Sequence, residues 1–329
     1  MPLRLIHVGL GPLGQRVLND LLDRQLCELV AAVDIAPNVC GKPVTDVIPN
    51  APHELRITPA IDHLPEADIA VVTTQSSVRD CAPVFRALLE QGLTVVSTCE
   101  ELLWPTLRHA TLAKELDALA KAHNARLLGT GVNPGFLMDT LPAVATTACH
   151  AVTSLRVERV QDATTRRIPF QRKIGATLSH EAFQAGIESG WLQHVGLGES
   201  MHLACDAAGL PITRWDECIE PVIAESPMTC GLGEIPAGHA AGVRQIAEAF
   251  HNDTRVAEFE FVAAIGQAEP RDAVHIEGEP SIDLVIPGGV HGDIATSAVT
   301  INAIPALRAA PPGLHTMLTI RTPHRWSAG

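Results

Sequence analysis

The chain has 329 residues, of which 46% are hydrophobic and 19% charged, and its formal net charge is −13. This is ordinary globular composition, and the length is comfortable for two hydrophobic cores. A net negative field repels phosphate backbones and anionic lipid, so neither nucleic acid nor a membrane is an expected partner.

The first part of the chain alternates short apolar strands with amphipathic helices. Each strand-like run is followed by apolar residues at helical spacing, and one helix ends at Gly92, as helices often do. Such alternation predicts right-handed βαβ units and a doubly wound parallel sheet of the Rossmann type. The strands are expected at residues 3–8, 27–34, 67–75, 93–99 and 125–132, and the helices at 9–25, 78–92 and 107–124.

The pattern changes after residue 150. Alternating runs at 152–161 and 255–266, and a hairpin at 272–289 that turns at 278–280, predict an open, mostly antiparallel sheet, with helices near 179–189 and 198–208. The tail returns to helix and then to proline-rich coil. We therefore expect an α/β dinucleotide-binding domain at 1–138, an α+β substrate and dimerisation domain at 139–292, and a segment at 293–329 that packs back on the first domain.

Targeting and metal motifs are not found in the sequence. The start, "MPLRLIHVGLG", enters a strand pattern directly, and no stretch approaches the roughly 18 apolar residues of a membrane span. Eight cysteines without a C-x-x-C pair indicate reduced thiols in a cytoplasmic protein. Although there are 15 histidines, none stands in H-E-x-x-H, and His194, Glu199 and His202 lack ligand spacing, so no metal site is expected.

A glycine loop between the first strand and the first helix predicts a dinucleotide site. Gly9 allows a tight turn, Gly11 lets the backbone approach a pyrophosphate, and Gly14 lets helix and strand pack closely. Asp34, at the end of the second strand, can accept hydrogen bonds from ribose hydroxyls and repels the extra phosphate of NADP, so NAD(H) is preferred, while Lys42 leaves NADP(H) possible. The loop is completed by Leu10, Pro12 and Leu13.

Three further strand ends belong to the same edge of the sheet, where open α/β proteins bind ligands. Thr73, Thr74 and Gln75 either flank the adenosine ribose or form a plain strand-to-helix turn. "STCEELL" at 97–103 brings Cys99, Glu100 and Glu101 to this edge, and "GTGVNPGF" at 129–136 brings Asn133, whose amide suits a carboxamide.

The paired acids have two interpretations. Thr98 and Glu101 have capping-box spacing, so Glu101 could simply satisfy backbone donors at a helix start. A carboxylate among apolar neighbours such as Val96 and Leu102 would instead be partly desolvated, which raises its pKa and suits a general acid or base. The sequence does not decide whether Glu100 or Glu101 faces a ligand.

The segments "GLGPLG", "STCEELLWP", "LLGTGVNPGFLMDTL", "HVGLGESMHL" and "IPGGVHGDIATSAVTINAIP" resemble the 2,4-diaminopentanoate dehydrogenase-like group, which includes the native amine dehydrogenases and shares the dihydrodipicolinate reductase fold. The resemblance spans nearly the whole chain. It implies reversible deamination of an amine to a ketone or aldehyde plus ammonia, with NAD(P), a catalytic carboxylate in the Glu100–Glu101 loop, and a homodimer formed through the second-domain sheet. The double histidine and lysine of dihydrodipicolinate reductases are missing, so that activity is not expected.

Candidate substrate contacts are less specific, since each is equally at home in an ordinary core. They are Phe136, Met138, Phe170, Trp191 and His194. An alternative is an amino-acid dehydrogenase in which Arg166, Arg167 and Arg172 hold a substrate carboxylate. A further alternative is a dinucleotide sensor without catalysis, although a sensor needs neither paired acids nor Asn133.

Overall fold

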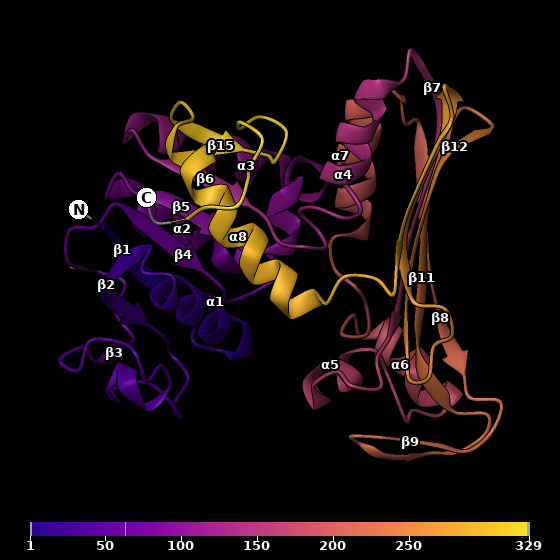
Figure 1. Ribbon diagram of the computed structural model, residues 1–329, viewed down its shortest axis with the longest axis horizontal. Helices are drawn as coiled ribbons and strands as arrows, with labels where there is room; N and C mark the ends of the chain where they lie inside the picture. The colour runs from indigo at the N-terminus through magenta and orange to yellow at the C-terminus, as the bar shows by residue number, and fades with distance from the viewer. Residues whose placement is uncertain (1, 63, 328–329) are drawn as a thin grey trace. The chain divides into compact units, whose positions relative to one another are not determined.

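The computed structural model describes residues 2–62 and 64–327. The chain forms two compact units: unit 1 is Met1–Phe136 with His291–Gly329, and unit 2 is Leu137–Val290 (Figure 1). Within the described residues, no helix is long and apolar enough to cross a membrane.

Unit 1 is built on a parallel sheet of seven strands in the order β15-β6-β5-β4-β1-β2-β3. β1 lies between β2 and β4, so the order of the strands reverses direction beside it, which is where doubly wound sheets bind ligands. The strands are β1 Leu3–Val8, β2 Cys27–Val33, β3 Ile57–Thr58, β4 Ile69–Val72, β5 Thr94–Ser97, β6 Arg126–Gly129 and β15 Gly313–His315. The predicted Rossmann-type sheet is confirmed.

Helices complete unit 1. α1 packs against α8, and α2 packs against α3 (Figure 1). The longer helices are α1 Pro12–Asp23, α2 Val78–Glu90, α3 Thr106–Ala122 and α8 Gly292–Arg308, and two 3-10 turns are η1 Val44–Asp46 and η2 Glu100–Leu103. The apolar residues of the helical patterns, such as Val17, Leu18 and Phe85, are fully buried, which explains why these segments are helices.

The proline-rich tail corrects one expectation. Instead of coil alone, it contributes β15, which pairs in parallel with β6 and starts where the Gly313 N–H donates to Ala125 O at 3.0 Å. The Leu314 N–H also donates to the Asp117 carboxylate of α3 at 3.0 Å. Three residues are too few to show a periodic pattern, so this strand depends on partners distant in sequence.

Unit 2 contains a six-stranded sheet in the order β14-β13-β7-β12-β11-β8. Only β7 and β12 pair in parallel, so the predicted mostly antiparallel sheet is confirmed. Helices lie against one face only, since α6 contacts β8 and α7 contacts β11 and β12 (Figure 1). The elements are α4 Thr140–Ala145, η3 Thr146–Ala148, β7 Ala151–Asp162, α5 Ile168–Lys173, α6 His180–Glu188, α7 Leu197–Ala208, β8 Arg214–Ile223, β9 Met228–Cys230, β10 Gly233–Ile235, β11 Ala240–His251, β12 Thr254–Ala264, β13 Arg271–Glu279 and β14 Ile282–Pro287.

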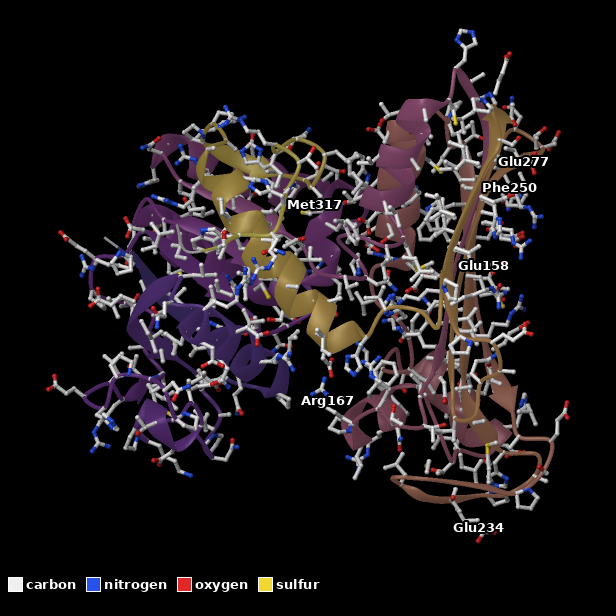
Figure 2. The ribbon with its side chains drawn as sticks, viewed as in Figure 1. Glu158, Arg167, Glu234, Phe250, Glu277 and Met317 are labelled. Carbon is white, nitrogen blue, oxygen red and sulfur yellow. The ribbon has the colours of Figure 1, made fainter. Side chains whose placement is uncertain are left out.

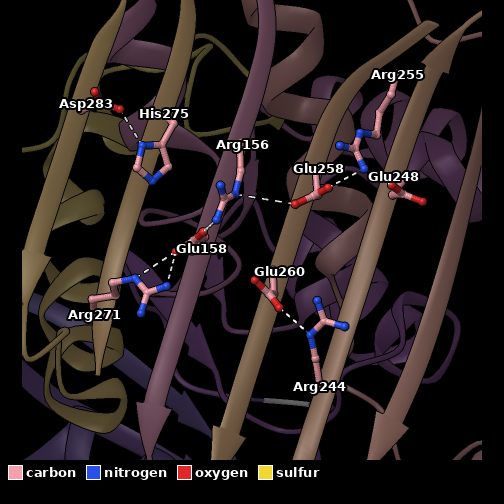
Figure 3. Close-up of polar contacts among 10 residues, drawn as sticks. All are labelled: Arg156, Glu158, Arg244, Glu248, Arg255, Glu258, Glu260, Arg271, His275 and Asp283. Carbon is pink, nitrogen blue, oxygen red and sulfur yellow. Dashed lines mark hydrogen bonds and ion pairs between the residues drawn. The ribbon is translucent and has the colours of Figure 1, made fainter. Parts of the chain in front are cut away.

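The helix-free face of this sheet carries a network of ion pairs (Figure 3). Glu158 is at its centre and is almost fully buried between Arg156 and Arg271, the latter at 2.7 Å. Burial raises the pKa of Glu158, but the hydrogen bond from Arg271 and the charge of Arg156 outweigh this and lower it. The face is therefore polar, with charges of both signs on neighbouring strands.

The opposite face holds a buried ion pair next to the end of unit 2. Arg159 Nη1 is 2.8 Å from Asp272 Oδ1, and the two side chains are only 2% and 4% exposed. Arg159 Nη2 donates to Val290 O at 3.0 Å, and the Val290 N–H donates to Asp272 Oδ2 at 2.7 Å. The pair therefore fixes the backbone at the last residue of unit 2.

We expect Asp272→Ala to lower the free energy of unfolding by about 3–5 kcal/mol, because it leaves the Arg159 guanidinium charged and uncompensated in the interior. Chemical denaturation measures the change. Asp283→Ala is the matched control, since the Asp283 side chain is 77% exposed where it meets His275 and its loss is expected to cost no more than about 1 kcal/mol. Equal, small losses in both variants would contradict the prediction.

Candidate active site

The glycine loop is shaped by close packing at two of its three glycines. Gly9 has φ +95°, and a Cβ there would lie 2.6 Å from Thr73 O. A Cβ on Gly14 would lie 1.9 Å from Gly9 O. Since these are contacts with backbone atoms, Gly9 and Gly14 are required by the fold itself.

Gly11 has a different environment. A Cβ there would meet no atom of the described residues within 4 Å, and its φ of −65° is accessible to any residue. Gly11 is the N-cap of α1, and among residues 2–62 and 64–327 no side chain caps this helix. The first turn carries no acidic residue, and Pro12 occupies the position that needs no N–H partner. Open space at an uncapped helix N-terminus fits a phosphate group.

Asp34 follows β2 and holds the loop from the other side. Its Oδ2 accepts the Leu10 N–H at 2.5 Å, and its Oδ1 accepts the Ala36 N–H at 2.7 Å. These two hydrogen bonds fix the carboxylate beside Leu10 of the glycine loop.

Thr73, at the end of β4, bridges to the glycine loop. Its Oγ1 donates to Gly9 O at 2.8 Å, and His7 Nε2 lies 3.0 Å from the same carbonyl oxygen. Thr74 Oγ1 is 3.6 Å from Cys81 Sγ, and Gln75 O accepts from that thiol at 3.5 Å. These contacts give Thr73 a structural role at the point where the strand order reverses.

Burial of His7 predicts that the stability of the protein depends on pH. Complete burial lowers the pKa of His7 to about 4, against smaller opposing effects of Gly9 and Asp34, so the ring is neutral in the folded protein. Because the unfolded pKa is 6.5, the folded state loses stability as pH falls from that value toward 4. We expect His7→Gln to reduce the slope of unfolding free energy against pH by up to about 1.4 kcal/mol per pH unit between about pH 6.5 and 5.

Urea denaturation at several pH values measures this slope. His194 supplies an internal reference, since burial, then the charges of Lys173 and Arg159, lower its pKa to about 3. A residual slope from His194 should therefore remain in His7→Gln. An unchanged slope in this variant would show that His7 titrates normally in the folded protein.

Glu101 lies in η2, directly after β5, and one oxygen of its carboxylate is held by two donors. Oε2 accepts the Val78 N–H at 2.8 Å and lies 3.0 Å from His109 Nε2. The side chain is 17% exposed, so the carboxylate is largely, but not completely, enclosed. Both contacts involve the same oxygen, which fixes the orientation of the group.

The predicted capping box does not form, but Glu101 does satisfy a backbone donor at a helix start, as the first interpretation expected. The N-cap of η2 is Cys99, and none of the described side chains caps this turn. The helix that Glu101 serves is α2, whose first residue, Val78, precedes Glu101 by 23 residues in the sequence. Sequence spacing within "STCEELL" could not show this, because the donor begins the helix that follows β4, whereas the acceptor belongs to the turn that follows β5.

Glu100 is half-buried and close enough to Cys81 and Cys99 for its charge to act on both thiols. Cys99 Sγ donates to Ser76 O at 3.1 Å. The interaction between the Cys81 and Cys99 thiols lowers the pKa of Cys81 to about 7 in spite of burial, and the same interaction together with burial raises the pKa of Cys99. The loops after β4 and β5 are therefore joined by several polar contacts.

Asn133, in the loop after β6, has an amide that the described residues leave unsatisfied. Both its Oδ1 and Nδ2 are buried, and within residues 2–62 and 64–327 neither has a hydrogen-bond partner. An unpaired buried amide costs free energy, so a group outside the chain is a natural partner. The loop is tightly packed, since a Cβ on Gly135 would lie 2.2 Å from Gly131 N.

The proposed substrate contacts have diverse environments. In unit 1, Phe136 is 38% exposed. In unit 2, Met138 is fully buried, and Trp191 is 47% exposed beyond α6. Phe170, on α5, lies under the Arg166 guanidinium at 4.1 Å. His194 stacks on Phe261 with ring centroids 4.2 Å apart, and its Nε2 is buried without a partner among the described residues.

The three arginines expected to bind a substrate carboxylate in an amino-acid dehydrogenase lie in α5 or just before it. Arg166 Nη1 donates to Gln161 Oε1 at 3.3 Å, and Arg172 lies in the last turn of the helix. Arg167 precedes the helix as its N-cap (Figure 2). Across the part of the chain that the structure describes, no group of three or more His, Cys, Asp or Glu side chains could hold a metal ion.

Comparisons with known proteins agree with this architecture. Residues 136–328 match the family model of the 2,4-diaminopentanoate dehydrogenase C-terminal domain. The 2,4-diaminopentanoate dehydrogenase of Acetoanaerobium sticklandii is 31% identical over 97% of this chain and 94% of that protein.

Solved structures show the same fold. The amine dehydrogenase of Mycobacterium smegmatis has a TM-score of 0.84 at 23% identity, covering 99% of this chain and 98% of that one. The WlbA dehydrogenase of Bordetella pertussis, solved with NADH and UDP-GlcNAcA, has a TM-score of 0.51 at 13% identity, covering 87% and 80%. With the curated relative and the family model in agreement, the chain belongs to the 2,4-diaminopentanoate dehydrogenase family of oxidoreductases.

Proposed function

We propose that the chain is an NAD(P)-dependent amine dehydrogenase, which interconverts a small amine with a ketone or aldehyde and ammonia. The observation that carries the proposal is the Glu101 carboxylate, one oxygen of which is held by Val78 and His109 at the ligand-binding edge of a parallel sheet. Membership of a dehydrogenase family supports the reaction class. The same membership disfavours a sensor without catalysis.

The cofactor is proposed to lie along the glycine loop. Gly11 provides the open approach for a pyrophosphate, the N-terminus of α1 provides its positive dipole, and Asp34 accepts from the ribose hydroxyls. Since Asp34 also repels a 2′-phosphate, we propose that NAD(H) is preferred over NADP(H). The buried amide of Asn133 is proposed to pair with the carboxamide of the cofactor.

Glu101 is proposed to be the proton-transfer group. When bound, the nicotinamide accepts or supplies the hydride at the substrate carbon. In deamination, Glu101 accepts a proton from the substrate ammonium, because only the neutral amine can expel hydride from the adjacent carbon. In amination, the protonated side chain donates to the carbinolamine hydroxyl, which leaves as water, and the resulting carboxylate stabilises the iminium cation.

An amino-acid dehydrogenase remains the second candidate. The relative from Acetoanaerobium sticklandii carries the name of such an enzyme. In this chain, Arg166 is held against Phe170 next to α5, with Arg167 and Arg172 close by in sequence, and a guanidinium is the preferred partner of a carboxylate. Under this alternative these arginines bind the substrate carboxylate.

The protein is further proposed to be a homodimer formed through the helix-free face of the unit 2 sheet, where charges of both signs are available for self-complementary pairing (Figure 3). Sedimentation should then give twice the chain mass of 35.0 kDa. A monomer at micromolar concentration would contradict this assembly.

The protein is also proposed to be cytoplasmic, as expected from the sequence. All eight cysteines are free thiols, which supports this location.

The decisive test is an assay of NADH oxidation with a panel of ketones, aldehydes and keto acids, with and without ammonia. Ammonia-dependent turnover of simple ketones or aldehydes is the expected result. Turnover restricted to keto acids would favour the amino-acid dehydrogenase and direct attention to Arg166. If no carbonyl compound supports ammonia-dependent oxidation, both candidates are wrong.

A further inference from the structure

His109 contacts Glu101, although no motif in the sequence relates the two residues. His109 lies in the first turns of α3, and its N–H donates to Pro105 O at 2.8 Å. At His109 the helix departs from helical geometry, with φ −136° and ψ 46°. The side chain leaves the regular path of α3 at this point and meets the η2 turn.

The contact is part of a two-sided clamp on one oxygen. His109 Nε2 is 3.0 Å from Glu101 Oε2, and the Val78 N–H approaches the same oxygen at 2.8 Å. The His109 and Glu101 side chains are only 16% and 17% exposed, which separates the pair from the freely rotating ion pairs of a protein surface. The two donors come from α3 and α2, so the clamp connects two helices to the loop after β5.

A carboxylate held by one donor can still turn about its last torsion, which has broad minima. Two donors converging on Oε2 remove this freedom and thereby set the direction of Oε1. Catalytic groups gain from such preorganisation, because a displacement of about 1 Å can cost about a hundredfold in rate.

We propose that His109 is a positioning residue: together with the Val78 N–H it immobilises Oε2 of Glu101, so that Oε1 faces the substrate nitrogen. This inference rests on the proposed role of Glu101 as the proton-transfer group. His109 itself exchanges no proton with the substrate and acts only through the orientation of the carboxylate. A neutral imidazole with its proton on Nε2 fulfils this role.

The test uses the full-length protein with His109→Ala, His109→Gln and the control His123→Ala, which alters the exposed C-cap of the same helix. The glutamine amide can donate to Oε2 but cannot relay protons at neutral pH. We expect His109→Ala to lower kcat about 10–100-fold with the NADH dissociation constant unchanged, and His109→Gln to recover kcat to within a few-fold of wild type. His123→Ala should match wild type.

Three results would overturn the proposal. Wild-type kcat in His109→Ala would show that the clamp is unnecessary, and equal loss in both His109 variants would indicate proton transfer by histidine. A parallel fall of kcat, NADH affinity and melting temperature would indicate that His109 stabilises the fold and does not specifically position Glu101.

Crystal structures of the two His109 variants provide a readout that does not depend on turnover. We expect the Glu101 carboxylate to rotate away from Val78 in His109→Ala and to keep its place in His109→Gln. An unmoved carboxylate in His109→Ala would reject the positioning role even if the wild-type protein turned out to have no ammonia-dependent activity, a result that would reject only the proposed function.

Discussion

Glu101→Gln is expected to lower ammonia-dependent turnover by about 10²–10⁴-fold, the usual contribution of a positioned general acid or base. The glutamine carbonyl can still accept the Val78 N–H that now binds Oε2 at 2.8 Å, so the loop after β5 should keep its conformation. The amide, however, cannot take a proton from an ammonium group. We therefore expect kcat to fall with little change in NADH affinity, measured by fluorescence titration.

Glu100→Gln is the matched comparison, because the two acids are adjacent and both belong to η2. If Glu101 transfers the proton, Glu100→Gln should retain kcat to within about tenfold of wild type. Loss of turnover only in Glu100→Gln would exchange the roles of the two acids and leave Glu101 as an anchor between η2 and α2. Near-normal turnover in both variants would remove the loop from the mechanism.

The second large effect is expected at the glycine loop, where Gly11→Ala and Gly14→Ala should separate cofactor binding from folding. A Cβ on Gly11 would meet no atom within 4 Å in the part of the chain that the structure describes, so Gly11→Ala should change the free energy of unfolding by less than about 1 kcal/mol. The methyl group would nevertheless occupy the space proposed for the pyrophosphate. We expect NADH to bind tenfold or more weakly, a loss of at least about 1.4 kcal/mol.

Gly14→Ala is expected to lower the stability of the fold. Its Cβ would lie 1.9 Å from Gly9 O, and Gly9 is itself fixed by a 2.8 Å hydrogen bond from its N–H to Val33 O. Overpacking against fixed backbone costs at least about 3 kcal/mol here, toward the upper end of what such substitutions cost, so thermal and chemical denaturation should both detect it. A Gly11→Ala protein that binds NADH as wild type does would contradict the proposed cofactor site, whatever happens in Gly14→Ala.

The sequence by itself determined the architecture of unit 1 around its first helix. Gly9, Gly14 and Asp34 lie within 26 residues. They form a turn, a close packing contact and a loop contact, and because these are local requirements they can be recognised as a short sequence motif. The sequence also predicted where the strands end. Alternating strands and helices imply a parallel sheet, and the loops that carry Thr73, Glu101 and Asn133 then lie at its carboxyl edge.

Only the tertiary structure decided how these loops are joined and which donors hold them. The Glu101 carboxylate meets Val78 and His109 across two helices, and the Arg159–Asp272 pair joins strands 113 residues apart. β15 exists because β6 offers it a free edge. Such contacts depend on the packing of segments that are distant in the chain, and the short-range hydrophobic period that predicts a helix or a strand contains no information about them.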